Sequence, residues 1–182
     1  MMHQRPVPPC RMETERLVLR PTSAADADRA FEIQSDWEVT RMLRMASFPP
    51  DREEIERWFA GHRREWAEGT AYRFAIEREE RVIGIVDLDE IDGGEGELGY
   101  WFERAAWGRG YASEAARAVV RFAFDDVGLT GLRSGHAADN PASGAVLRRL
   151  GFRLLDSVEC RSRSRGGTFV QCRYTLPRPD LA

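Results

Sequence analysis

Lysine is absent from this chain of 182 residues, so all 27 of its basic residues are arginine. Aspartate and glutamate together number 30, the net charge is -3, and arginine balanced in this way does not by itself create a surface for polyanions. We therefore expect no direct binding of nucleic acid. The lack of lysine also excludes the usual phosphate-binding P-loop, which needs Gly-Lys followed by Ser or Thr.

Long apolar runs and paired cysteines are missing as well. No segment approaches the roughly 18 apolar residues of a membrane-spanning helix, and residues 1–10 lack the apolar core of a signal peptide. We expect a cytoplasmic protein without a membrane partner. The three cysteines, Cys10, Cys160 and Cys172, do not have C-x-x-C spacing, so neither a disulfide framework nor a metal site is predicted.

What is present fits one globular domain. Hydrophobic residues make up 42% of the chain and charged residues 31%, which is typical of a folded protein rather than a disordered one. A domain of this length buries roughly 70% of the surface that its unfolded chain exposes. Prolines cluster near the start, so we expect a flexible segment over residues 1–12 and a single domain over residues 13–182.

Apolar periodicity predicts an α/β fold with the element order β-α-α-β-β-β-α-β-α-β-β. Asp51 is placed to cap a helix whose apolar positions, from Ile55 to Trp66, recur every three or four residues. Strands are predicted over residues 15–20, 72–77, 81–88, 98–102 and 132–137 and in two final segments, and helices over residues 24–35, from Asp51, and over residues 111–124 and 141–150.

The segment over residues 97–116, ELGYWFERAAWGRGYASEAA, leads from a strand through a glycine-containing turn into a helix. Gly108 and Gly110 let the backbone approach an anion, and the helix adds the positive end of its dipole. The segment therefore indicates a site for a phosphorylated cofactor, although a tight connection alone also explains the two glycines. A nicotinamide-binding loop would need a third glycine where Ser113 stands.

Three segments, in order, resemble the GCN5-related N-acetyltransferases. WGRGYASEA (residues 107–115) resembles the family's acetyl-CoA pyrophosphate loop, NPASGAVLRRLGF (residues 140–152) its N-x-x-S helix, and TERLVLRP (residues 14–21) its opening strand. Together they resemble the branch that acetylates ribosomal-protein N-termini. The resemblance implies a twisted, mixed and largely antiparallel sheet of about seven strands flanked by about four helices. It also implies acetyl-CoA as co-substrate, no metal, and a monomer or homodimer.

The resemblance also implies roles for individual residues. Asn140 would bind the pantetheine arm of the donor, and Ser143 would lie near the thioester sulfur. Asn140 followed by Pro141 is equally a good start for a helix, so local folding offers a second explanation. The other donor-binding residues implied are Tyr100, Trp101, Phe102, Trp107, Gly108, Arg109, Gly110, Tyr111, Ala112 and Ser113.

This sequence departs from the family pattern at two positions. Ala105 stands where many members have Gln or Arg, so backbone amides must do more of the phosphate binding. Leu147 stands where many members have a tyrosine that protonates the leaving thiolate. Ser143 is the best replacement on that helix, and a thiolate needs little help because a free thiol has a pKa of about 8.5.

Direct attack of an amine on a thioester needs a group that accepts the amine's proton. Glu97, at the head of the strand before the loop, is our candidate for this catalytic base, and Asp87, Asp89 and Glu90 compete with it. His136 is a second-rank candidate in the acceptor site. The other central histidine, His62, falls in an apolar stripe and is expected to be packed.

The acceptor amine, a protein N-terminus or a small molecule, is not specified by these motifs. The resemblance implies that the region over residues 37–48 walls the acceptor pocket, although its aromatic and methionine side chains could equally belong to the core. The cationic segment over residues 161–167, RSRSRGG, is either a solvated hairpin tip or a site that recruits an acidic acceptor. Two other functions stay open: a non-catalytic acyl-CoA-binding module of the same fold and, more distantly, a nicotinamide-binding oxidoreductase.

Overall fold

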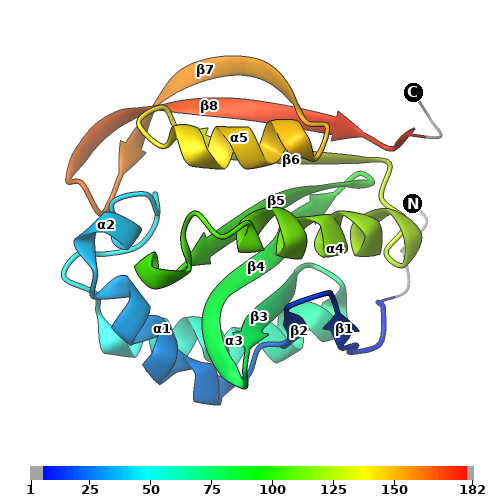
Figure 1. The fold of residues 1–182 in the computed structure, drawn as a ribbon, viewed down its shortest axis with the longest axis horizontal. Coiled ribbons are helices and arrows are strands. Elements are labelled where there is room, and N and C mark those ends of the chain that lie inside the picture. The colour runs from blue at the N-terminus through cyan, green and yellow to red at the C-terminus, as the bar shows by residue number, and fades with distance from the viewer. Residues whose placement is uncertain (1–5, 180–182) are drawn as a thin grey trace.

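The computed structural model describes residues 6–179, and Figure 1 shows helices on both faces of one sheet. The strand order is β1-β2-β3-β4-β5-β6-β8-β7, and all neighbours are antiparallel except β5 and β6. The strands are β1 (Met12–Glu13), β2 (Val18–Pro21), β3 (Tyr72–Arg78), β4 (Arg81–Asp92), β5 (Glu95–Phe102), β6 (Gly131–Ala137), β7 (Arg153–Ser162) and β8 (Gly167–Pro177). The helices are α1 (Ala27–Gln34), α2 (Trp37–Thr40), α3 (Arg52–Glu68), α4 (Tyr111–Asp125) and α5 (Pro141–Arg149), with short 3-10 turns η1 (Ala24–Asp26) and η2 (Arg104–Ala106).

The predicted α/β class with its mixed, largely antiparallel sheet is confirmed. Two short elements come in addition, the two-residue strand β1 and the one-turn helix α2. Elements of this length are too short to show hydrophobic periodicity, which explains why the sequence did not indicate them.

The expected flexible segment, residues 1–12, lies partly outside the described residues. Where it is described, it makes contacts with the domain: the Val7 backbone N–H donates to the Tyr72 hydroxyl at 3.2 Å, and the Val7 carbonyl accepts from the Trp66 indole at 2.8 Å. Val7, Cys10 and Met12 also pack against the main core. Within residues 6–179, no helix is long and apolar enough to cross a membrane.

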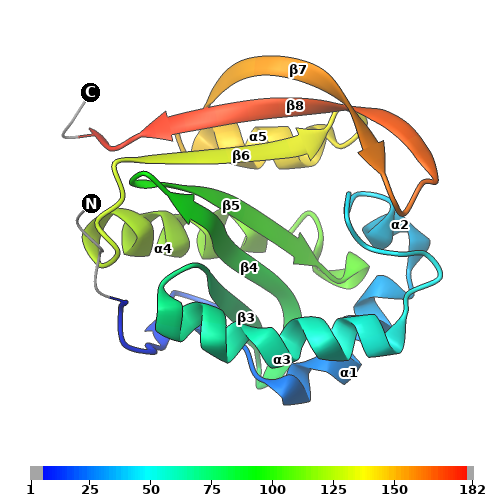
Figure 2. The ribbon, with the colours of Figure 1, turned by 180° about the vertical axis from the view of Figure 1, so that it is seen from behind.

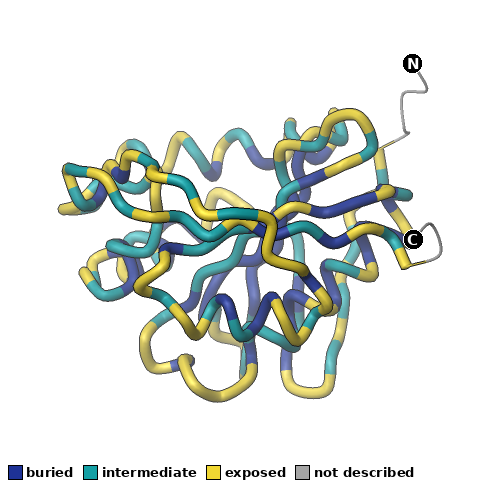
Figure 3. Tube along the Cα trace, turned by 90° about the horizontal axis from the view of Figure 1, so that it is seen from above, coloured by how far each residue is buried: buried dark blue, intermediate teal, exposed yellow. Residues whose placement is uncertain are grey.

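The helices form two layers. α4 and α5 cover one face of the sheet (Figure 1), and α1 and α3 cover the opposite face (Figure 2). Local chemistry fixes the ends of α3, because the Asp51 carboxylate accepts the Glu54 N–H at 3.1 Å and Gly69 adopts a left-handed conformation that stops the helix. Figure 3 shows buried stretches alternating with exposed turns along the chain.

Strand β5 contributes to both layers because successive side chains point to opposite faces. Leu98 and Phe102 belong to the main core with α4, and Tyr100 packs against it. Trp101 packs instead on the smaller cluster formed with α1 and α3. The odd-numbered positions of β5 therefore lie on the α1 and α3 side, and the even-numbered positions on the α4 and α5 side.

The two parallel strands, β5 and β6, separate after a short contact. Their register pairs end at Glu97 with Arg133. Beyond that point the Ser134 hydroxyl donates to the Leu98 carbonyl at 2.7 Å, while β6 continues to pair with β8 as far as Ala137. The sheet therefore opens between β5 and β6 along the part of β5 that follows Glu97 and leads to the loop before α4.

Candidate active site

The loop between β5 and α4 contains two glycines in left-handed conformations. Gly108 has φ of 70° and Gly110 has φ of 80°, values that residues with a Cβ rarely adopt. A Cβ at Gly108 would meet no atom within 4 Å, so this side of the loop is open. Gly110 is also the N-cap of α4. The loop thus places backbone N–H groups at a helix N-terminus, an arrangement that binds phosphate.

The start of α5 lies across the gap from β5. Asn140 is the N-cap of α5, and its side-chain oxygen accepts the Ser143 N–H at 3.4 Å. Tyr100 of β5 reaches this helix, where its hydroxyl lies 2.9 Å from Ser143 Oγ and 3.2 Å from the Ser143 carbonyl oxygen. Burial raises the pKa of Tyr100 to about 12, so the phenol keeps its proton at neutral pH.

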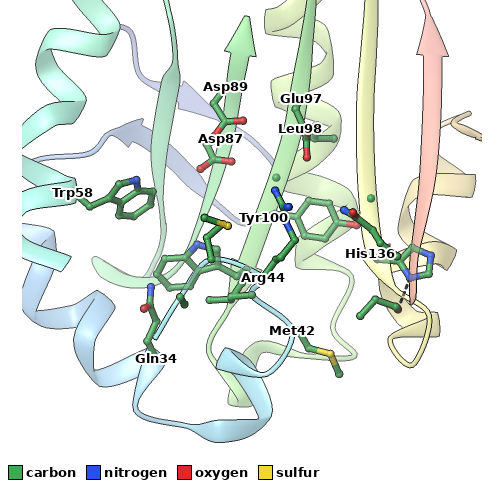
Figure 4. A pocket seen from close by; sticks show the side chains of 18 of the residues that line it. Gln34, Met42, Arg44, Trp58, Asp87, Asp89, Glu97, Leu98, Tyr100 and His136 are labelled. Carbon is green, nitrogen blue, oxygen red and sulfur yellow. Dashed lines mark hydrogen bonds between the residues drawn. The ribbon is translucent and has the colours of Figure 1, made fainter. Parts of the chain in front are cut away.

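A cavity of about 510 Å³ opens on the α1 and α3 side of the same gap (Figure 4). Its lining includes Leu98 and Tyr100 from one face of β5 and Glu97 and Trp101 from the other, so the cavity extends into the gap. The remaining walls come from residues 42–47 and from α1, α3, β3, β4, β6 and β8.

Carboxylates dominate the charged lining of this cavity. Asp87 and Asp89 project from β4 beside Glu97 of β5, with Asp89 paired to Glu97 in the strand register (Figure 4). The buried Arg73 guanidinium binds the two aspartates through one nitrogen, at 2.7 Å to Asp87 and 3.0 Å to Asp89. Its Nε binds Glu65 of α3 at 2.8 Å. One arginine therefore compensates three carboxylates.

Three carboxylates that line the cavity, Asp87, Asp89 and Glu97, have raised pKa values. Burial, and then the charge of Asp89, raises the pKa of Asp87, although Arg73 opposes the shift. Burial, and then the charges of Glu90 and Asp89, raises the pKa of Glu97. A carboxylate with a raised pKa is a stronger base, and a cation bound nearby would relieve the repulsion among these groups.

The model of the acetyltransferase (GNAT) domain family matches residues 16–153. The chain belongs to the GNAT acetyltransferase family. It is 32% identical over 173 residues to the uncharacterized N-acetyltransferase p20 of Bacillus licheniformis, an alignment that covers 93% of this chain and 97% of the relative. It is 27% identical over 118 residues to the ribosomal-protein-serine acetyltransferase of Escherichia coli K12, covering 64% of this chain and 66% of the relative.

Solved structures show the same fold. The RimL ribosomal L7/L12 α-N-protein acetyltransferase, solved with coenzyme A, superposes with a TM-score of 0.81 at 18% identity, covering 90% of this chain and 95% of that one. The family match shows that the protein is an N-acetyltransferase. Its GNAT fold has eight strands within residues 6–179, where the resemblance implied about seven.

The predicted donor-binding residues of this acetyltransferase differ in whether their side chains or only their backbone groups can reach a ligand. Phe102 and Tyr111 are buried in the main core, so only their backbone groups can reach a ligand. Trp107 is exposed, and its indole N–H donates to the Phe102 carbonyl at 3.1 Å. The Arg109 side chain folds back onto the Ala105 carbonyl at 3.1 Å.

Two more residues at the start of α4 complete the predicted set. Ala112 packs against the main core beside the loop. The Ser113 hydroxyl oxygen is buried and has no hydrogen-bond partner among residues 6–179.

The two central histidines of the acetyltransferase lie in different places. His62 is buried on α3, where its Nδ1 lies 2.8 Å from the Thr22 hydroxyl and its ring packs edge-on against Trp58. This agrees with the packed role that the sequence indicates. His136 lines the cavity, but its Nδ1 lies 2.8 Å from the Ala137 carbonyl and its Nε2 3.3 Å from the Tyr174 hydroxyl.

The cationic segment over residues 161–167 forms the tip of the hairpin between β7 and β8, and other parts of the acetyltransferase bind it. The Arg163 N–H donates to the Arg44 carbonyl at 2.8 Å, and Ser164 Oγ donates to the Leu43 carbonyl at 3.0 Å. Arg165 forms an ion pair with Asp139 at 2.9 Å, beside Asn140. The tip therefore contacts the cavity wall over residues 42–47, and Arg163 and Arg165 are engaged in ion pairs within the chain, with Glu54 and Asp139.

Sequence reasoning missed Arg73, although one signal was present. Arg73 interrupts the apolar run over residues 71–76, and a charged residue at such a position is rarely buried without a partner. It also missed Arg16 and Glu114, which meet beside the glycine loop although 98 residues separate them. No local pattern could reveal that contact.

Proposed function

We propose that this acetyltransferase transfers the acetyl group of acetyl-CoA by direct attack of a primary amine, and that the amine is bound as a cation by the carboxylate cavity. The observation that carries the proposal is the placement of two sites on opposite sides of one opening. The glycine loop and the start of α5 lie on the α4 and α5 side, and the carboxylates lie on the α1 and α3 side. Thioester and amine would meet between β5 and β6.

The donor side has the groups that acetyl-CoA needs. The N–H groups around Gly108 and Gly110 suit the pyrophosphate. Backbone groups alternate along β5, and since the Leu98 carbonyl faces β6, the Tyr100 N–H faces the gap as well. That N–H can donate to the pantetheine arm or to the oxygen on which negative charge develops during attack. When bound, acetyl-CoA supplies an activated acetyl carbon and a thiolate leaving group.

The acceptor side has the groups that prepare an amine. Glu97, directly or through water, takes the proton that an alkylammonium must lose before its nitrogen can attack. The nitrogen then forms a bond to the acetyl carbon, the carbon–sulfur bond breaks, and the sulfur leaves with the electron pair. Ser143, whose hydroxyl lies 2.9 Å from that of Tyr100, would donate a hydrogen bond to that sulfur. The amine's remaining extra proton passes to solvent.

The charge of the cavity supports an acceptor whose neighbouring groups are neutral or cationic. Glu90 and Glu97 add negative charge to the carboxylate cluster that Arg73 only partly neutralises. Besides Arg73, the lining contains one other arginine, Arg44. The name of the Escherichia coli relative and that of the RimL structure support a protein N-terminus as acceptor. A small amine of the same charge fits the cavity equally.

A matched amine series tests this proposal. Pentylamine, cadaverine and δ-aminovalerate carry a methyl, an ammonium and a carboxylate group at the far end of similar chains. We expect kcat/KM, followed by thiol release from acetyl-CoA, to fall in the order cadaverine, pentylamine, δ-aminovalerate. Two tripeptides, one with Lys and one with Glu in the second position, repeat the comparison for a protein N-terminus, and the Lys peptide should have the higher kcat/KM.

Each other outcome has a definite meaning. A preference for δ-aminovalerate or for the Glu peptide would overturn the cationic acceptor and point to Arg44. Binding of coenzyme A with no thiol release from any amine would favour the non-catalytic acyl-CoA-binding module. A thermal shift with NAD and none with coenzyme A would overturn the donor assignment.

A further inference from the structure

Arg16 reaches from the turn between β1 and β2 to the glycine loop before α4. Its Nη1 donates to the Arg109 carbonyl at 2.9 Å, inside the loop itself. Its Nε and Nη2 both bind Glu114 Oε2 at 2.7 Å. One guanidinium therefore joins the loop to the first turn of the helix that follows it.

Glu114 is held on its other oxygen as well. Glu114 Oε1 accepts the Arg16 backbone N–H at 2.8 Å and the Thr14 hydroxyl at 2.6 Å. These hydrogen bonds and the Arg16 charge lower the pKa of Glu114 even though burial opposes the shift. The carboxylate is thus ionised and anchors the turn over residues 14–16 against α4.

The bond to the Arg109 carbonyl has a consequence for the direction of the next N–H. In a trans peptide the C=O and the N–H point in opposite directions. Because the Arg109 C=O points at Arg16, the Gly110 N–H of the same peptide points away from the β1–β2 turn. Gly108 and Gly110 allow the loop backbone to adopt several conformations, and these orient the peptide differently. A hydrogen bond from outside the loop is therefore needed to stabilise one orientation.

Charge gives Arg16 a second effect on the same site. Glu114 lies in the first turn of α4, where its negative charge alone would oppose an anion bound at the loop. Arg16 neutralises that charge at hydrogen-bond distance, and its Nη2 would lie 3.3 Å from a Cβ placed on Gly110. The guanidinium is therefore close to the backbone that would receive the phosphates.

We infer that Arg16 is a positioning residue for donor binding, which orients the peptide between Arg109 and Gly110 so that its N–H serves the pyrophosphate. This inference rests on the proposed function, because it takes acetyl-CoA as the ligand of the loop. It also accounts for Ala105, which offers no side chain to the phosphates. In this chain the Arg16 guanidinium, from the turn between β1 and β2, supports the loop through the Arg109 carbonyl instead.

Arg16→Gln, Arg16→Lys and the control Arg173→Gln test this inference. Arg173 forms a comparable two-point ion pair with Asp156, at 2.5 Å and 2.7 Å, and is similarly half-exposed but lies on the β7–β8 hairpin. For Arg16→Gln we expect the Kd for coenzyme A and the KM for acetyl-CoA to rise at least about tenfold, the effect of one charge-assisted hydrogen bond. The amine KM and the kcat at saturating donor should change less than about twofold.

A donor without the pyrophosphate gives the discriminating measurement. S-acetyl-pantetheine lacks the group that the loop binds, so its kcat/KM should be the same for the wild type and Arg16→Gln. Arg16→Lys should behave like Arg16→Gln, because one ammonium cannot hold both the Arg109 carbonyl and two-point contact with Glu114. Arg173→Gln should leave every constant unchanged.

Several results would overturn the inference. An unchanged Kd for coenzyme A in Arg16→Gln would do so, as would an equal loss with acetyl-CoA and S-acetyl-pantetheine, which would indicate a general structural role. Full rescue by lysine would show that charge alone suffices. Failure of the proposed function looks different, since the wild type itself would then bind no coenzyme A.

Discussion

The Tyr100 hydroxyl lies 2.9 Å from Ser143 Oγ and so joins β5 to α5 across the opening between β5 and β6. Tyr100 comes from the strand that precedes the glycine loop, and Ser143 from the helix that Asn140 begins. The pair therefore links the two parts of the predicted donor site, which are the glycine loop after β5 and the start of α5. It also brings a phenol to Ser143, one helical turn before Leu147.

Ser143→Ala should lower kcat about tenfold to a hundredfold, which is at or below the lower end of the range for general acid catalysis, because a thiolate leaves readily. Tyr100→Phe should lower kcat by a smaller factor, since it removes the partner of Ser143 but keeps the packed ring. Steady-state kinetics with acetyl-CoA and a good amine would measure both. If both variants kept the full kcat, the hydrogen-bonded pair would have no part in the chemistry.

Glu97→Gln should lower kcat/KM about a hundredfold at neutral pH by removing the base. In the wild type, kcat/KM should rise as the pH rises through the pKa of Glu97, which burial and the neighbouring carboxylates raise above 4.5, because only the deprotonated form accepts a proton. The variant should lose this limb of the pH profile.

Glu95→Gln is the matched control for that experiment, because Glu95 is exposed two positions earlier on β5 and lies on the same face. It should retain wild-type kinetics. A fully active Glu97→Gln variant would transfer the role of base to Asp87, Asp89 or Glu90.

Arg73→Met should lower the free energy of unfolding by about 3–5 kcal/mol, because it leaves Glu65, Asp87 and Asp89 without their shared cation. Arg73 is only 8% exposed, so solvent cannot replace that cation. Urea unfolding at neutral pH measures the change. Arg173→Met, which breaks an exposed pair, should lower the free energy of unfolding far less. Equal effects of the two variants would contradict the importance of burial.

His62 should make the protein less stable in mild acid. Burial, and then the charge of Arg73, lowers the pKa of His62 from 6.5 to about 4. The unfolded chain therefore binds a proton between these values that the folded one does not, and stability is lost as the pH falls through this window. From pH 7 to pH 5 this group should remove about 2 kcal/mol from the free energy of unfolding.

His62→Phe is the comparison variant, since phenylalanine fills a similar volume beside Trp58 and Phe59. Urea unfolding at both pH values would show a smaller difference in the variant. An equal loss of stability in both proteins would show that His62 does not titrate as its burial requires.

Local signals predicted most of the elements. Asp51 and Asn140 mark helix starts through their own chemistry, and the Gly108–Gly110 loop is recognisable because residues with a Cβ rarely adopt those backbone angles. The alternation along β5 could have told its two faces apart, but not which ligand each face would meet.

The sequence by itself determined the order of the longer helices and strands and indicated a glycine-containing loop before α4, because these depend on residues close together in the chain. Only the tertiary structure decided that β5 and β6 part after Glu97, that Arg73 gathers three carboxylates, and that Arg16 meets Glu114. Strand register and long-range ion pairs depend on how distant segments pack together. That packing follows from the whole core, and no segment specifies it alone.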